Sequence, residues 1–402
     1  MVNDQQLVLF LLQVLVLLSL GRSLGELFRR WGHPPLVGEL LVGIAVGPTL
    51  FGRVAPELQQ TLFPTDLLQR TMLETVSWVG VLFLLLDTGL HVDVSAAWRQ
   101  RGPALKVGTL GVLFPLVLGS VLSLGLPVHY LATPERPILF ALFLGTTMSI
   151  SALAVMARVL YDLDLMKSDL GLLTLCGYAV KDLLAWVIFS LLLALAATST
   201  VALPTTAVFV GLTLTFTTLC LTLGRRLVDS AIVGLTTHMS HQPGMVFTFV
   251  CCLGFSCGVI THGLGLNALF GFLLAGMMAG EARMLSERTR HIVSQMVHAL
   301  FVPLYFASVG LRFDFFAGFG AGLVVFVTVV SIVGKFLGAW TGTVGTSLSR
   351  ADRLSIGIAF TPGGVTEIIL AKAALDAQIF TVPVFVAVGV AAVFSSLWWG
   401  HC

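Results

Sequence analysis

The chain has 402 residues, of which 57% are hydrophobic and only 10% are charged. Soluble globular domains carry about 25% charged residues, so this composition excludes an ordinary soluble protein and indicates an all-α, polytopic membrane protein. The formal net charge is +2. Such a small charge provides no field that would recruit nucleic acid, and we expect no nucleic-acid partner.

Apolar segments of membrane-spanning length predict about thirteen transmembrane helices, since a helix needs about 20 apolar residues to cross a bilayer. The segments cover approximately residues 6–28, 34–50, 71–90, 103–126, 137–160, 168–196, 203–224, 244–262, 265–280, 296–312, 319–347, 351–374 and 380–399. Lys and Arg are concentrated in the loops on one side, for example at Arg29, Arg30, Arg225 and Arg226. The positive-inside rule therefore predicts an N-terminus outside the cell and a cytoplasmic C-terminus.

Two short motifs occur twice in the same order. Residues 38–43 (GELLVG) of span 2 resemble residues 271–276 (GFLLAG) of span 9, and residues 89–93 (GLHVD) after span 3 resemble residues 310–314 (GLRFD) after span 10. The matched spans run in opposite directions, which predicts inverted repeats with span 7 as a linker helix at about 203–224. The glycine spacing of spans 2 and 9 also predicts a homodimer formed through these spans.

An apolar run at residues 173–192 carries Lys181 and Asp182 at its middle. A charge at the centre of a transmembrane helix costs roughly 2.5–3.5 kcal/mol on insertion scales, so the two residues need partners, water or a function. They could neutralise one another and only fix the packing of helices. We favour an ion or proton site at mid-membrane, and we expect Lys335, near the middle of span 11, to pair with Asp182 or Glu367.

Two spans carry residues that interrupt helices. These residues are Thr146, Thr147, Ser149 and Ser151 in span 5, and Pro362, Gly363 and Gly364 in span 12. Proline cannot continue the hydrogen-bond ladder of a helix, although a simple proline kink is the alternative interpretation of span 12. Interrupted helices at membrane depth expose carbonyl groups and helix ends that bind ions. We therefore expect the two breaks to cross near Asp182, with Thr146, Thr147 and carbonyl groups completing an ion site.

The six cysteines lie mostly in apolar runs, and their spacing matches no zinc site. We interpret them as small core residues. The only metal that we expect is a monovalent cation at Asp182, and we expect no cofactor.

Four motifs resemble those of the monovalent cation:proton antiporter-2 family, and the likeness spans nearly the whole chain. They are residues 33–48 (HPPLVGELLVGIAVGP), 301–311 (FVPLYFASVGL), 334–338 (GKFLG) and 361–367 (TPGGVTE). The resemblance implies the sodium/proton-antiporter fold with two crossed broken helices. It also implies a core part at about 103–200 and 319–400, and a dimerising interface part at about 1–95 and 244–315.

The resemblance further implies that Asp182 is the ion-binding aspartate and that Lys335 is its basic partner. The family usually has Asp, Asn or Gln at the position of Lys181, and often a basic residue at the position of Gly363. We interpret the chain as an antiporter that exchanges Na⁺ or K⁺ for protons by alternating access in the inner cell membrane, and not as an enzyme. The alternatives are a transport-inactive membrane sensor or subunit, and a transporter of another solute.

Overall fold

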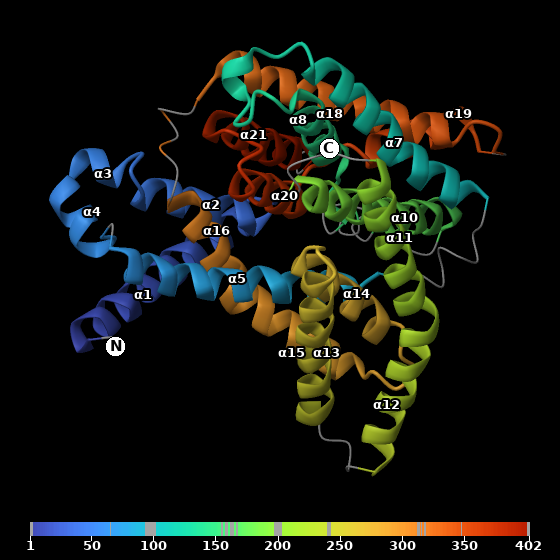
Figure 1. The fold of residues 1–402 in the computed structure, drawn as a ribbon, viewed down its shortest axis with the longest axis horizontal. Coiled ribbons are helices and arrows are strands. Elements are labelled where there is room, and N and C mark those ends of the chain that lie inside the picture. Colours follow the sequence, from blue (N-terminus) through green and yellow to red (C-terminus); the bar gives the residue numbers. More distant parts are fainter. Residues whose placement is uncertain are drawn as a thin grey trace.

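The computed structural model is almost entirely helical (Figure 1). It describes residues 3–64, 66–92, 102–153, 156, 160, 165, 168–196, 203–238, 243–311, 314, 316, 319–346 and 348–399. The helices of the first half are α1 (Asp4–Arg30), α2 (Pro35–Val46), α3 (Phe51–Val54), α4 (Pro56–Leu62), α5 (Leu67–Leu90), α7 (Pro103–Ser123), η1 (Val128–Tyr130), α8 (Pro137–Ser149) and α10 (Asp169–Ala196). Those that follow are α11 (Leu203–Leu219), η2 (Cys220–Gly224), α12 (Arg225–His238), α13 (Pro243–Gly263), α14 (Ala268–Gly280), α15 (Glu287–Met296), η3 (Val297–Phe301), α16 (Val302–Leu311), α18 (Ala321–Gly342), α19 (Arg350–Ala359), α20 (Val365–Asp376) and α21 (Val382–Trp399).

Each predicted span has a helical counterpart. Within the part of the chain that the structure describes, nine helical runs are long and apolar enough to cross a membrane, and α8, α14 and part of α21 are shorter apolar helices. The predicted span 12 is divided between α19 and α20. The membrane class and the helical fold are therefore confirmed, while the number of membrane crossings stays a prediction.

Two helices continue beyond the apolar segments that predict them, and the ends of the membrane spans stay predictions. Span 7 was expected to end near Gly224, but the helical run continues through the π-turn η2 and α12 to His238. Similarly, the helix of span 10 begins at Glu287 and passes through the π-turn η3. Charged residues such as Arg225 end a hydrophobic run, but they do not end an amphipathic helix.

The helices form two groups, each of which combines both halves of the sequence (Figure 1). In the first group, α7 packs against α8, α10 and α18, and α21 packs against α18 and α20. In the second, α2 packs against α1 and α16, and α14 packs against α5 and α13. The run α11–η2–α12 lies along one side, where α11 contacts α10 and α12 contacts α13 and α14.

Two equivalent glycine contacts hold the second group together. A Cβ atom added to Gly43 of α2 would lie 2.0 Å from the carbonyl oxygen of Ala307 in α16. One added to Gly276 of α14 would lie 2.1 Å from the carbonyl oxygen of Leu86 in α5. The predicted repeat pairs span 2 with span 9 and span 3 with span 10, and it relates these two contacts to each other. The inverted repeat itself stays a prediction.

The same contacts correct the predicted dimer surface. Glycines of α2 and α14 are occupied by neighbouring helices of this chain, and every residue of α14 from Leu269 to Ala279 is buried. These glycines therefore cannot form the centre of an interface with a second copy. Of the residues in the matched motifs, Asp93, Arg312 and Phe313 lie outside the described residues, as does Cys402.

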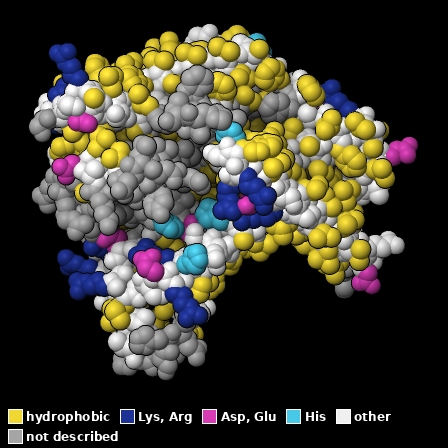
Figure 2. Space-filling view, turned by 180° about the vertical axis from the view of Figure 1, so that it is seen from behind, with side chains coloured by type: hydrophobic (Ala, Val, Ile, Leu, Met, Phe, Trp, Pro, Cys, Tyr) yellow, Lys and Arg dark blue, Asp and Glu magenta, His cyan; other side chains and the backbone are white. Residues whose placement is uncertain are grey.

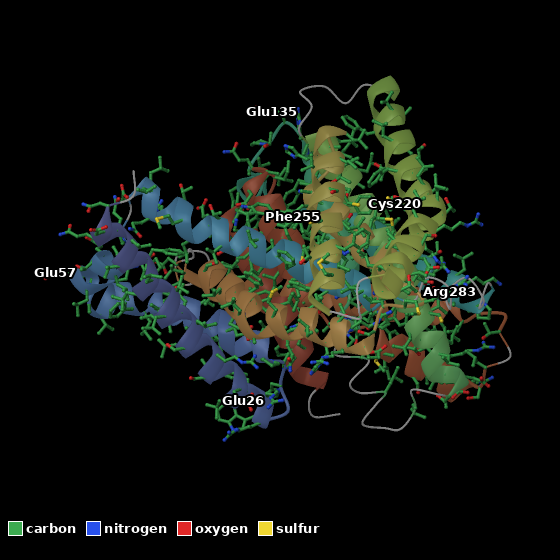
Figure 3. All side chains as sticks on the ribbon, turned by 90° about the horizontal axis from the view of Figure 1, so that it is seen from below. Glu26, Glu57, Glu135, Cys220, Phe255 and Arg283 are labelled. Carbon is green, nitrogen blue, oxygen red and sulfur yellow. The ribbon has the colours of Figure 1, made fainter. Side chains whose placement is uncertain are left out.

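The face of the molecule in Figure 2 carries extensive apolar surface. On α1 the side chains of Leu7, Val8, Leu11 and Leu15 are all exposed. Charged side chains such as Glu26, Glu57 and Arg283 lie toward the edges of the bundle (Figure 3). Exposed apolar helices with charges at the periphery are what a lipid environment requires.

Candidate ion-binding site

The break in span 12 is confirmed and lies between α19 and α20. Residues 361–364 are not helical. Pro362 has no backbone N–H and so cannot donate the hydrogen bond that a continuous helix would need there. Two serines of α21 bind the freed backbone. The amide of Gly363 donates to Ser395 Oγ (3.0 Å), and Ser396 Oγ donates to the carbonyl oxygen of Gly363 (2.6 Å). The interrupted backbone is thus satisfied inside the protein, as membrane depth requires.

The break in span 5 is also confirmed. Helix α8 ends at Ser149, and residues 150–152 are not helical. Helical bonding resumes where the amide of Met156 donates to the carbonyl oxygen of Ala152 (3.2 Å). The hydroxyl groups of Thr146 and Thr147 donate to the carbonyl oxygens of residues 142 and 143 in the preceding turn, at 2.7 and 2.8 Å. A hydroxyl group that donates a hydrogen bond keeps the lone pairs of its oxygen. Both threonines can therefore still accept a hydrogen bond or coordinate a cation.

The two breaks cross, as predicted. Ser151 Oγ donates to the carbonyl oxygen of Phe360 (2.5 Å), and the amide of Ala152 donates to the carbonyl oxygen of Pro362 (2.9 Å). A Cβ atom added to Gly364 would lie 2.5 Å from Ala152 Cβ, a distance that real atoms do not adopt. Glycine at position 364 is therefore required by the approach of the two backbones.

Lys181 binds the crossing and not Asp182. Its side chain is fully buried, and Nζ donates to Ser151 Oγ. The ammonium group also lies 5.0 Å from the ring centroid of Phe360, the residue at which α19 ends. The C-terminal end of a helix is its negative end, so a cation is stabilised there. Within the described residues, no ion pair joins Lys181 to Asp182.

Lys335 pairs with Glu367, which decides between its two predicted partners. Nζ of Lys335 contacts Oε1 of Glu367, and the two side chains are 0% and 4% exposed. One turn earlier on α18, Ser331 Oγ donates to the carbonyl oxygen of Met148 (3.1 Å). Helix α18 therefore touches both broken segments, through Ser331 at span 5 and Lys335 at span 12.

Asp182 is the carboxylate that these contacts leave unsatisfied. It is 7% exposed, and its Oδ1 is buried with no hydrogen-bond partner in the described part of the chain. Tyr178 lies one turn earlier, on the same helix face, and its hydroxyl donates to the carbonyl oxygen of Ala359 (2.7 Å). Asp182 thus lies on a face of α10 that is directed at the crossing. Thr146 and Thr147 are fully buried in α8, which packs against α10, but no hydrogen bond between them and Asp182 is found in the described residues.

Four buried charged groups form the centre of the site. Lys181 interacts electrostatically with Asp182, Glu367 and Lys335. Two acids and two bases balance when all four are ionised. Buried charges are stable only when they are paired or hydrogen-bonded, and a buried carboxylate oxygen without a donor is a place for a proton or a cation.

Sequence reasoning missed the polar residues that hold the crossing. These are Tyr178, Ser331, Ser395 and Ser396. The signal available was a hydroxyl group within an apolar span, and the adjacent pair Ser395 and Ser396 was the clearest instance. Small hydroxyl residues also serve ordinary helix packing, so this signal becomes specific only when the partner backbone is known.

A membrane bundle with two broken, crossing segments around buried charges is the arrangement of a secondary transporter. The chain belongs to the family described as sodium/hydrogen exchanger, transmembrane, whose sequence profile matches residues 14–400. The family is one of transporters, which agrees with the resemblance noted from the motifs.

Individual relatives agree with this assignment. The chain is 27% identical to the Na(+)/H(+) antiporter NhaS4 of Synechocystis, covering 98% of this chain and 96% of that protein. It is 28% identical to Cation/H(+) antiporter 18 of Arabidopsis thaliana and 24% identical to K(+)/H(+) antiporter 1 of Saccharomyces cerevisiae, but it spans only 48% and 44% of their lengths. The sodium proton antiporter MjNhaP1 of Methanocaldococcus jannaschii shares the fold, with a TM-score of 0.73, 16% identity, and coverage of 98% and 96% of the two chains.

Proposed function

We propose that this protein exchanges a monovalent cation, Na⁺ or K⁺, for protons across the inner cell membrane. The observation that carries the proposal is the buried Oδ1 of Asp182, which has no hydrogen-bond donor among the described residues. One carboxylate cannot hold a proton and a cation together, so Asp182 binds them alternately. The relatives of this chain include Na⁺/H⁺ and K⁺/H⁺ antiporters, which supports this substrate class.

The transport cycle is alternating access between two parts of the chain. The core part comprises residues 103–200 and 319–400, and the interface part comprises residues 1–95 and 244–315, with residues 203–224 as a linker. The separate packing of α7, α8, α10 and α18 on one side, and of α1, α2, α14 and α16 on the other, supports this division. Rocking of the core part would carry Asp182 between the two membrane surfaces, with the N-terminus outside and the C-terminus cytoplasmic.

The protein works as a homodimer that uses a surface other than the glycines of α2 and α14. Helix α1 is the least buried candidate span of the interface part among the described residues, since only 17% of its apolar segment is buried, and its exposed apolar face is the surface that we propose for the dimer. Native mass measurement in mild detergent tests the assembly, and a monomer alone would contradict it.

The contact of Lys181 with Ser151 favours transport over an inactive sensor. A sensor that retained the fold would use the ammonium group of Lys181 to fill the place of the cation at Asp182. The ammonium group instead donates to Ser151 Oγ and lies 5.0 Å from the ring centroid of Phe360, at the end of α19.

Purified protein in liposomes loaded with a pH-sensitive dye tests the function. Addition of NaCl or KCl should release protons from vesicles with an acidic interior, and the Asp182→Asn variant should release none. Glu57→Gln in α4 is the control, because this exposed carboxylate lies at the edge of the molecule (Figure 3). Proton flux in Asp182→Asn equal to that of the unchanged protein would refute the role of Asp182. Absence of flux in all variants would favour the sensor.

A further inference from the structure

An apolar cavity lies between the two groups of helices. It has a volume of about 140 Å³ and is lined by α2 and α16 on one side and by α20 and α21 on the other. Helices α2 and α16 lie in the proposed interface part, and α20 and α21 lie in the proposed core part. The described lining residues are all apolar side chains or glycines, so their side chains provide no group that would bind an ion or another polar ligand.

The two walls of the cavity are separate packing units. On one side, a Cβ atom added to Gly310 of α16 would lie 2.5 Å from the carbonyl oxygen of Leu40 in α2, so these two helices are in backbone contact. On the other side, α20 packs against α21. A movement of the core part against the interface part would therefore change the width of the cavity.

A glycine in one wall keeps the cavity open. Gly389 of α21 is buried, yet a Cβ atom added to it would meet no atom of a neighbouring helix within 4 Å. Other described glycines with such open space, for example Gly211 and Gly322, are exposed on the surface. Glycine in the interior of a helix is less stable than alanine, and no close approach of a neighbour requires glycine at position 389. The missing side chain therefore points to an occupant of the space that it leaves free.

The cavity is continuous with the lipid-facing surface. At its rim, Leu41 of α2 is 39% exposed, whereas Ile368 of α20 and Phe385 of α21 are buried at its floor. Exposed apolar side chains on a membrane-spanning helix face the hydrocarbon of the bilayer. A hydrocarbon chain can thus enter from the bilayer without passing a charged or polar side chain among the lining residues.

The size and lining of the cavity favour hydrocarbon over water. A cavity of about 150 Å³ lined by Leu, Ile and Phe stays dry in a soluble protein and binds small hydrocarbons. An empty cavity is unfavourable, because its lining atoms lose dispersion contacts on one side. In a bilayer, the apolar molecules next to the opening are the acyl chains of lipids.

The wall formed by α20 and α21 is also the part of the protein that holds the break in span 12. Ile368, at the floor of the cavity, directly follows Glu367 in α20. Ser395 and Ser396 of α21 bind the backbone of Gly363. An occupant of the cavity therefore contacts the two helices that position this break.

We propose that this cavity binds the end of one acyl chain of a bilayer lipid, held between the core part and the interface part. The bound chain fills the space beside Gly389 and contacts both walls. It stabilises the conformation in which the cavity is open, because a ligand shifts an equilibrium toward the state that binds it better. This effect on the conformation rests on the proposed antiport function, whereas the binding of the chain does not.

Photo-crosslinking in liposomes tests the site. The purified protein is reconstituted with phosphatidylcholine that carries a photoactivatable diazirine group on an acyl chain, and labelled peptides are mapped by mass spectrometry. We expect adducts in the peptides that contain residues 40–44 and 385–393. Gly389→Leu places a side chain in the cavity and should lower the yield of these adducts several-fold. Gly211→Leu in α11, where the open space lies at the surface, is the matched control and should leave the yield unchanged.

The unfolding temperature in detergent separates a filled cavity from a misfolded protein. Gly389→Leu should unfold at the same or a higher temperature than the unchanged protein, because it replaces a glycine inside a helix and fills a cavity. Should Gly389→Leu fail to fold, Gly389→Ala takes its place and should lower the adduct yield by a smaller factor. An unchanged yield in the variant that folds would show that the chain lies only on the outer surface, and the proposal would be wrong.

Transport measurements test the effect on the conformation separately. If the unchanged protein exchanges ions, Gly389→Leu should slow the exchange several-fold, because the leucine side chain acts as a permanent occupant, and Gly211→Leu should not. Loss of the adducts with an unaltered exchange rate would confirm the acyl-chain site and refute its effect on transport. If the unchanged protein exchanges no ions, the antiport function fails, and the crosslinking result still decides whether the cavity binds an acyl chain.

Discussion

The hydroxyl group of Ser151 donates a 2.5 Å hydrogen bond to the carbonyl oxygen of Phe360, a residue 209 positions later in the chain. The same hydroxyl group accepts a hydrogen bond from Nζ of Lys181. One small side chain therefore joins the two broken segments and binds the ammonium group of Lys181. The crossing and the charge state around Asp182 depend on the same atom.

We predict that Ser151→Ala weakens cation binding. Without its acceptor, the Lys181 ammonium group would turn to the unsatisfied Oδ1 of Asp182, with which it interacts electrostatically, and would compete with the cation. The half-saturating cation concentration should rise by roughly tenfold or more, since a hydrogen bond to a charged group contributes about 1.5–3 kcal/mol. Proton flux as a function of Na⁺ or K⁺ concentration measures the effect.

Ser149→Ala is the matched control for this prediction. Ser149 Oγ donates to the carbonyl oxygen of Thr146 in the preceding turn, whereas Lys181 binds Ser151. The half-saturating cation concentration of Ser149→Ala should stay within about twofold of that of the unchanged protein, because a local side-chain hydrogen bond of this kind can be replaced within the helix. Equal effects of the two substitutions would contradict the role given to Ser151.

Removal of one partner of the Lys335–Glu367 pair should destabilise the protein strongly. Both side chains are almost completely buried, so Lys335→Met leaves an uncompensated carboxylate. Breaking a buried ion pair costs about 3–5 kcal/mol, whereas replacing both partners by apolar residues is often neutral. The apparent unfolding temperature in detergent should therefore fall in Lys335→Met and recover in the double variant Lys335→Met/Glu367→Leu. If the unfolding temperature of the double variant stays as low as that of Lys335→Met, the broken ion pair is not the cause of the destabilisation.

The approach of Gly364 to Ala152 predicts a compensating pair of substitutions. Gly364→Ala would place a methyl group 2.5 Å from Ala152 Cβ and force the crossing segments apart. Overpacking of this kind typically costs about 1–3 kcal/mol, and the displacement should also abolish most cation-dependent proton flux. In the double variant Ala152→Gly/Gly364→Ala the obstructing methyl group is gone, so flux should return in part. Unfolding temperature and flux, measured on the same samples, check both expectations.

The sequence was sufficient to predict the membrane class, the two broken helices and their crossing. Pro362 removes a backbone donor, and the cluster of hydroxyl residues before Ser151 can satisfy an unwound segment, so both breaks have local causes. The charges Lys181, Asp182, Lys335 and Glu367 were recognisable because each interrupts an apolar run of membrane-spanning length.

The pairing of these charges could not be predicted from the sequence. Lys335 could reach either Asp182 or Glu367, and only the packing of α18 against the crossing decides for Glu367. The orientation of the Lys181 side chain depends on its contacts with Ser151 and Phe360, which belong to the two broken segments and not to α10. The glycines of α2 and α14 indicated close packing correctly, but spacing alone does not say whether the neighbour belongs to the same chain.

The balance of buried charges predicts electroneutral exchange. Lys181 is held by Ser151 and Lys335 by Glu367, so both can keep their protons while Asp182 alternates between one proton and one monovalent cation. The site then carries the same net charge when it holds the proton as when it holds the cation. Exchange rates in liposomes should therefore be nearly equal with the membrane potential clamped at zero or set strongly negative inside. Rates that change steeply with the membrane potential would contradict an exchange of one proton for one monovalent cation. In Lys181→Asp a second carboxylate could release a second proton, so this variant should gain a dependence on potential that the unchanged protein lacks.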